Sequence, residues 1–193
     1  MTSKEDLEQK RRSQTNELYC EIGRFIVCFE LINFTIQHSI TMIIDCFGLK
    51  KQSITYCLIA GYTARQLIDL FVSLINEIYE LSAKDRLIFD HICSRFIKLI
   101  EKRNEIIHST WFIGWGNETT EDYSEASAFR NHKSKKGADL QSFRRKAEDF
   151  KSLSTEAESL RMLFMGLETC ILLPIPFSKY FSLEKGQIIT NNA

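Results

Sequence analysis

The chain has 193 residues, 44% of them hydrophobic, and its 25 lysines and arginines balance 25 aspartates and glutamates. This length and apolar content allow one domain with a buried core, which argues against disorder, and the zero net charge excludes a global basic field that would attract nucleic acid. Two prolines and eight glycines provide few turn signals, so we expect an all-α fold, an antiparallel bundle of four to five long helices.

Four long segments carry apolar residues at spacings of three and four, as one buried helical face requires. They are expected at residues 4–47, at residues 51–81, from residue 82 to the 103–108 run, and from about residue 139 until Pro174. Ser82 followed by Asp85 resembles a capping box at the start of the third segment. Thr155 with Glu158 leaves open a restart within the fourth.

A charged stretch separates the last two segments. Within a single domain of residues 1–193, we expect residues 114–138 to form an exposed charged loop insertion and residues 174–193 a C-terminal tail. Residues 117–125 hold four acidic residues and no basic one, whereas residues 129–146 hold seven basic residues against one acidic. Six of these basic residues are candidate RNA-binding positions: Arg130, Lys133, Lys135, Lys136, Arg144 and Arg145.

Aromatic residues lie near this basic cluster in the sequence, namely Trp111, Trp115 and Tyr123. Positive charge combined with aromatic rings is what a channel for single-stranded RNA uses. The plainer interpretation of the basic cluster is a solvated surface, and the sequence leaves both open.

The cellular compartment is predicted from two features. The six cysteines are scattered, mostly in apolar stretches and without C-x-x-C spacing, which is typical of buried thiols in a reducing compartment. The first dozen residues are charged, unlike a secretory signal, and charges such as Arg24, Glu30 and Asp45 interrupt the apolar stretch at residues 22–47. We therefore expect a cytoplasmic protein with no membrane span.

Phosphate-binding glycine loops, paired zinc spacings and nucleophile elbows are absent from the sequence, and we expect neither a metal nor a cofactor. The remaining candidate for chemistry is the run from Arg103 through Asn104 to His108, near the end of an amphipathic segment. On a helix, Arg103 and His108 lie about 140° apart with Asn104 between them, which makes a polar wedge. Such a group is also ordinary surface and capping material.

The run from Glu101 to Trp111 resembles the R-x-x-x-x-H segment of HEPN domains, where asparagine often follows the arginine and a small residue and an aromatic often follow the histidine. The segment Ile22–Glu30 looks like the opening helix of these families, and the order of the helices also fits. The resemblance covers about residues 18–172. One departure is Thr110, because HEPN toxins controlled by nucleotidyltransferase antitoxins often carry tyrosine at that position.

The resemblance implies metal-independent RNA cleavage at a site formed by two protomers, and therefore a homodimer with an RNA substrate. His108 would move protons at the 2′-hydroxyl or the leaving 5′-oxygen, Arg103 would stabilise the phosphate, and Asn104 would orient the pair or the ribose. A role in prokaryotic stress or antiviral defence, with a partner protein that restrains or triggers activity, follows by analogy. The alternatives are a non-catalytic HEPN module that dimerises or binds nucleotide or a partner, and a generic helical scaffold.

Other polar residues are weaker candidates. A cleft could be lined by Glu30, Asn33, Arg65 and Asp69, although hydrogen bonding between helices explains these residues equally well. His38 lies in an apolar segment and is interpreted as a satisfied core or interface histidine.

Overall fold

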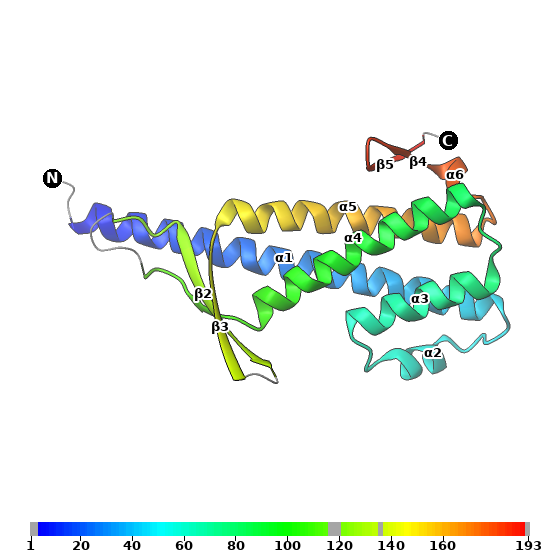
Figure 1. Cartoon of the computed structure of the whole chain (residues 1–193), viewed down its shortest axis with the longest axis horizontal. Coiled ribbons are helices and arrows are strands. Elements are labelled where there is room, and N and C mark those ends of the chain that lie inside the picture. The colour runs from blue at the N-terminus through cyan, green and yellow to red at the C-terminus, as the bar shows by residue number, and fades with distance from the viewer. Residues whose placement is uncertain (1–3, 116–120, 135–136, 192–193) are drawn as a thin grey trace. The chain divides into compact units, whose positions relative to one another are not determined.

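The structure is a computed structural model that describes residues 4–115, 121–134 and 137–191, without the side chains of residues 132–134, 138 and 139. Across these residues the chain is mostly helical with a small antiparallel sheet (Figure 1), so the predominantly helical fold predicted from the sequence is confirmed. The chain divides into two compact units, residues 1–29 with 101–157 and residues 30–100 with 158–193. The three longest helices contribute residues to both units: α1 (Lys4–Cys46), α4 (Ala83–Ile107) and α5 (Ala147–Leu172).

The helix boundaries agree with the sequence in some places and differ in others. The capping box at the start of α4 is confirmed, because Ser82 Oγ accepts a hydrogen bond from the backbone N–H of Asp85 at 3.2 Å. The second predicted helix was wrong as one segment and forms α2 (Gln52–Ile59) and α3 (Ala64–Ile78). Thr63 starts α3 with a capping box of its own, in which its N–H donates to Gln66 Oε1 at 2.8 Å.

The core of the second unit is built from phenylalanine rings. Phe71 of α3 lies 6.0 Å from both Phe89 of α4 and Phe164 of α5, and Phe96 lies 5.5 Å from Phe164. All four side chains are fully buried, or nearly so. Such pairs stabilise a core beyond the burial of their area, by about 0.5–1.5 kcal/mol each.

Residues 177–190 of the predicted C-terminal tail have regular structure, contrary to the sequence prediction. They form α6 (Phe177–Tyr180) and a hairpin of β4 (Phe181–Glu184) with β5 (Gln187–Thr190). Phe177 and Phe181 are buried. A Cβ atom added at Gly166 would lie 2.6 Å from the Phe181 ring, so α5 approaches this segment closely at a residue without a side chain.

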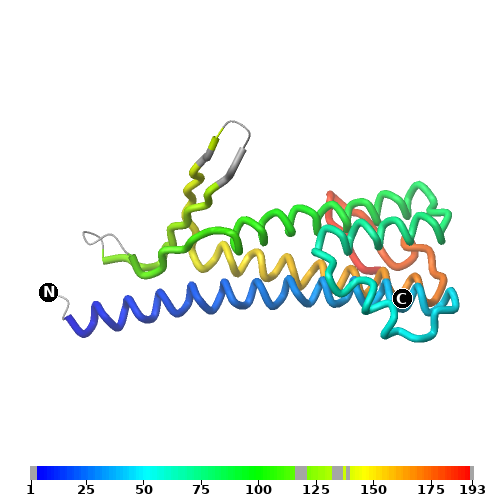
Figure 2. The backbone as a smooth tube through the Cα atoms, turned by 90° about the horizontal axis from the view of Figure 1, so that it is seen from below, coloured from blue at the N-terminus to red at the C-terminus, as the bar shows by residue number. Residues whose placement is uncertain are grey.

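The first unit contains a three-stranded antiparallel sheet in the order β1 (Thr110–Phe112), β2 (Glu125–Ser134) and β3 (Gly137–Lys146). Figure 2 shows β2 and β3 running side by side as one hairpin. The predicted loop insertion at 114–138 was therefore wrong over β2, and the predicted helix from 139 begins only at Ala147. The reason is that Ala126 and Ala128 alternate with polar residues and are fully buried, which is the period of a strand.

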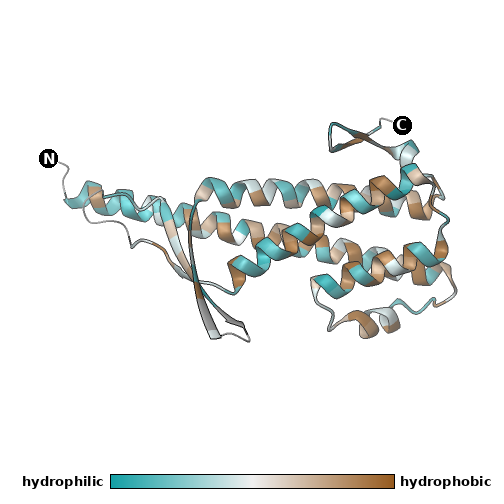
Figure 3. Ribbon diagram, in the orientation of Figure 1, coloured by the Kyte–Doolittle hydropathy of each residue, from teal (hydrophilic) through white to brown (hydrophobic). Residues whose placement is uncertain are grey.

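Figure 3 shows the first turns of α1 as mostly hydrophilic. Farther along, α1 is the one described helix that is long and apolar enough to cross a membrane; core helices of soluble proteins and signal sequences pass the same test. The cytoplasmic location stays an expectation. The prediction of buried cysteines was half wrong, because all six are free thiols but Cys20, Cys46 and Cys57 are exposed.

Candidate functional site at the end of α4

Residues Arg103 to Ile107 form the end of α4 and His108 follows directly after it, and side chains that come next in the sequence hold this helix end in place. A helix end leaves its last carbonyl groups without partners inside the helix. Here Ser109 Oγ donates to the Glu105 carbonyl, and Trp111 Nε1 donates to the Ile106 carbonyl at 2.8 Å. The N–H of His108 donates to the Asn104 carbonyl at 3.1 Å. The backbone that carries His108 is therefore well defined, while its side chain is exposed.

Trp111 connects this turn to the core of the first unit. It belongs to β1, and its ring lies 5.5 Å from Phe143 of β3 and 5.3 Å from Phe150 of α5, in edge-to-face geometry. Phe150 is fully buried. Because Trp111 both packs in this core and caps α4, the sheet fixes the position of His108 three residues before it.

Arg103 and Asn104 lie together on the same turn. The guanidinium group of Arg103 stands 5.5 Å above the ring of Phe29, and its Nη1 donates to Asn104 Oδ1 at 3.3 Å. Both side chains are half-buried. The ring and the amide hold the guanidinium group of Arg103 in one orientation near the end of α4.

Glu105 was not a candidate residue in the sequence, but it joins the end of α4 to β3 of the sheet. Its Oε1 accepts from Arg145 Nη2 at 2.5 Å, and Lys102 Nζ lies 3.3 Å from its Oε2. Burial disfavours the charged carboxylate, but the hydrogen bond and charge of Arg145, with Lys102, outweigh this and lower the pKa of Glu105 below its ordinary value. No sequence signal pairs residues 40 positions apart.

The six RNA-binding candidates have different surroundings. Arg145 is engaged with Glu105 and with the ring of Phe143, and its side chain is only 21% exposed. Arg144 is 72% exposed and pairs with Glu125 at 3.4 Å. Arg130 is half-buried. Lys135 and Lys136 lie outside the described residues, as does the side chain of Lys133.

The proposed cleft residues form pairs inside single helices. Asn33 donates to Glu30 Oε2 at 2.9 Å within α1, and Arg65 donates to Asp69 Oδ2 at 3.0 Å within α3. These pairs have the spacing of three and four residues that any helix surface brings together. Hydrogen bonding within a helix therefore explains their polarity.

Sequence reasoning missed two clusters. His38 Nδ1 lies 3.0 Å from Glu168 Oε1, and Ser39 Oγ donates to Glu168 Oε2 at 2.7 Å, which joins α1 to α5 in the second unit. The interpretation of His38 as a satisfied histidine agrees with this contact. In the first unit, Phe112 and Phe129 form an aromatic group with Trp115. The alternation of small apolar residues in 125–134 was the signal that could have placed Phe129 on a strand.

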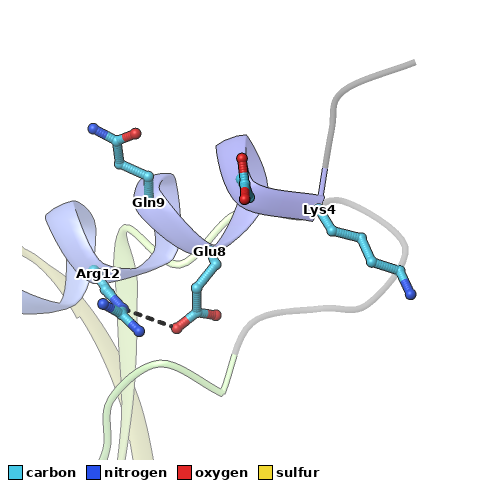
Figure 4. A pocket seen from close by; sticks show the side chains of 5 residues that line it. Lys4, Glu8, Gln9 and Arg12 are labelled. Carbon is cyan, nitrogen blue, oxygen red and sulfur yellow. Dashed lines mark hydrogen bonds and ion pairs between the residues drawn. The ribbon is translucent and has the colours of Figure 1, made fainter.

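The hollows described for this structure do not coincide with the motif. Figure 4 shows one at the start of α1, lined by residues 4, 5, 8, 9 and 12 of a single exposed helix, where Arg12 pairs with Glu8 at 3.0 Å. Another, of about 220 Å³, adjoins Asp85 in the second unit. Burial disfavours the Asp85 carboxylate, but hydrogen bonds from Ser82 and the Ser178 N–H outweigh this and lower its pKa, so Asp85 has a structural role.

Comparisons of the chain with protein-family models, with curated proteins and with solved structures found no match. The resemblance to HEPN domains therefore depends on the residues of the sequence itself. Within the described residues, no group of three or more His, Cys, Asp or Glu side chains is placed to hold a metal ion.

Proposed function

We propose that the chain is a metal-independent endoribonuclease of HEPN type, with Arg103, Asn104 and His108 at its active site, acting in the cytoplasm in prokaryotic stress or antiviral defence. The assignment of the helices to a HEPN-type antiparallel bundle is part of this proposal. The observation that carries it is the last turn of α4, where an oriented guanidinium and an exposed imidazole share one helix end that neighbouring side chains hold in place.

The chemistry follows from these groups. Histidine exchanges protons near neutral pH, so His108 can take the proton of a 2′-hydroxyl or give one to the departing 5′-oxygen. The 2′-oxygen attacks the phosphorus and the bond to the 5′-oxygen breaks, which leaves a 2′,3′-cyclic phosphate and a 5′-hydroxyl. Arg103 carries a permanent charge on a planar fork that suits the crowded phosphate of the transition state. Asn104 positions Arg103 through the hydrogen bond between them.

The proposal includes a homodimer, because the attacking 2′-oxygen and the leaving 5′-oxygen lie on opposite sides of the phosphorus, and a second copy of the chain would supply a histidine for the side that the first does not reach. Ile107, beside His108, is 40% exposed, which suits a contact between two copies of this helix end. The second unit exposes further large apolar side chains on α1 and α5: Leu31, Phe34, Met162 and Met165. Light scattering at micromolar concentration should give a dimer mass, and a monomer alone would remove the composite site.

The decisive experiment is cleavage of single-stranded RNA in the presence of EDTA, with analysis of the product ends. Wild-type protein should leave cyclic phosphates, and His108→Ala and Arg103→Ala should each lower the rate by at least ~10²-fold with unchanged dimerisation and melting temperature. Arg103→Lys should also fail, because an ammonium group lacks the guanidinium fork. Dependence on a metal would contradict the mechanism.

His91→Ala is the matched control, since His91 is a half-buried histidine of the same helix outside the motif. It should cleave as wild type does. If the Arg103 and His108 variants retain full activity, or lose it only because the dimer dissociates, the motif is an interface element. The non-catalytic HEPN module, binding nucleotide or a partner protein, is then the better assignment.

A further inference from the structure

The sheet of the first unit has two different faces, which the strand register defines. Trp111 is opposite Ala128, and Ala128 is opposite Phe143, so these side chains share the face that packs on Phe150. Phe112 is opposite Ser127, and Ser127 is opposite Arg144, so they share the other face. Side chains alternate along a strand, and each face is therefore continuous across the three strands.

The second face carries an exposed aromatic cluster. The ring of Phe112 lies 5.0 Å from Trp115 and 5.5 Å from Phe129, both in edge-to-face geometry. Trp115 is 76% exposed and Phe129 is 39% exposed. Grouped aromatic rings that stay in water on the side of a sheet away from its core are characteristic of binding surfaces.

Basic side chains lie on the same face. Arg144 of β3 lies across the sheet from Phe112 of β1, with Ser127 of β2 between them, two strand spacings or about 10 Å away. Its 72% exposed side chain pairs with Glu125, and such a surface pair is weak enough for a phosphate to replace it. Lys146 is opposite Glu125 in the register and is also exposed. The polar residues Ser127 and Ser142 separate rings from charges.

We propose that this face, formed by Phe112, Trp115, Phe129, Arg144 and Lys146, binds single-stranded nucleic acid by stacking bases on the rings and contacting phosphates with the cations. Stacked bases need open ring faces and nearby positive charge, and both are present here. A duplex keeps its base faces covered and would not fit. The inference goes beyond the proposed cleavage and does not need it, because binding can be measured with the inactive His108→Ala protein.

The test is fluorescence anisotropy at low salt with labelled oligouridylate and oligothymidylate of about 12 nucleotides, within the usual range of site sizes, and with a duplex of equal length. Both single strands should bind and the duplex should bind much more weakly. Phe129→Ala and Phe129→Leu should each weaken binding about tenfold, whereas Phe129→Tyr should retain it, because leucine keeps the apolar area but cannot stack. Base stacking should also quench the fluorescence of Trp115, and Trp115→Phe should lose this signal.

Matched controls separate this surface from the rest of the protein. Arg144→Ala should reduce the slope of log affinity against log salt by about 0.7, as expected for one lost phosphate contact on a single strand. Arg24→Ala should not, although Arg24 is also an exposed arginine in a surface ion pair. Phe47→Ala, which removes a 70% exposed ring in the second unit, should leave binding unchanged.

Two results would overturn the inference: no binding of either single strand by wild-type protein, or unchanged binding by Phe129→Leu. Unchanged binding together with a loss of self-association in Phe129→Leu would make the face a contact between copies of the chain. Melting temperatures of all variants must stay close to that of wild type. The outcome of the cleavage assay does not depend on the outcome of these binding measurements, so either proposal can be refuted while the other is retained.

Discussion

Replacing Glu105 by glutamine removes the negative charge that pairs the end of α4 with Arg145 of β3 and keeps the shape of the side chain. The side chains of Glu105 and Arg145 are only 24% and 21% exposed, so water screens their pairing less than that of a surface pair. A hydrogen bond to a charged group contributes about 1.5–3 kcal/mol. We expect Glu105→Gln to lower the free energy of unfolding by this amount, and the melting temperature by about 3–12 °C for a chain of this size.

The stabilisation by the Glu105 carboxylate depends on pH in a definite direction. The pKa of Glu105 is lowered in the folded protein, because Arg145 and Lys102 outweigh the opposing effect of burial. A carboxyl group of this kind binds its proton more weakly in the folded than in the unfolded state. Its contribution to the free energy of unfolding is therefore complete above the ordinary pKa of 4.5 and is lost as the pH falls through the lowered pKa. The difference between wild type and Glu105→Gln should be full near neutral pH and should shrink in acid.

Thermal unfolding followed by circular dichroism at neutral and acidic pH measures both effects. Glu125→Gln is the matched control, because Glu125 forms an exposed pair with Arg144 on the same hairpin, and such pairs contribute only ~0–1 kcal/mol. A double-mutant cycle with Arg145→Gln isolates the coupling. Equal losses in Glu105→Gln and Glu125→Gln, or a difference that grows in acid, would refute the reasoning.

Substitutions at four further positions test packing and helix capping by thermal unfolding. Gly166→Ala should destabilise the protein by about 1–3 kcal/mol because the added Cβ meets Phe181 and Tyr180, whereas Gly23→Ala, with open space in the exposed part of α1, should stabilise it by about 0.5–1 kcal/mol; the same sign for both would contradict this. Thr63→Ala should cost about 1 kcal/mol by removing the capping box of α3, and Thr63→Ser should retain most of it. Trp111→Phe should cost about 1–2 kcal/mol, since it leaves the Ile106 carbonyl without its donor, and no change would show that the cap is dispensable.

The sequence by itself determined the features that depend on near neighbours in the chain. Apolar residues three and four apart predicted the long helices, Ser82 with Asp85 predicted the start of α4, and Pro174 marked the end of α5. These signals are local because a helix satisfies its own backbone hydrogen bonds. The placement of the Arg103–His108 run at the end of a helix followed from the same reasoning, whereas its chemistry stays a prediction.

Only the tertiary structure decided which residues of the 125–146 region face the core and which face water. Arg144 and Arg145 are adjacent and chemically identical, yet Arg145 pairs with Glu105 on one side of the sheet and Arg144 is exposed on the other. A strand turns successive side chains to opposite faces, so their roles depend on the register with β2 and on what covers each face. That information resides in partners far away in the chain, Trp111 and Phe150 for one face and Phe112 for the other, and no local pattern contains it.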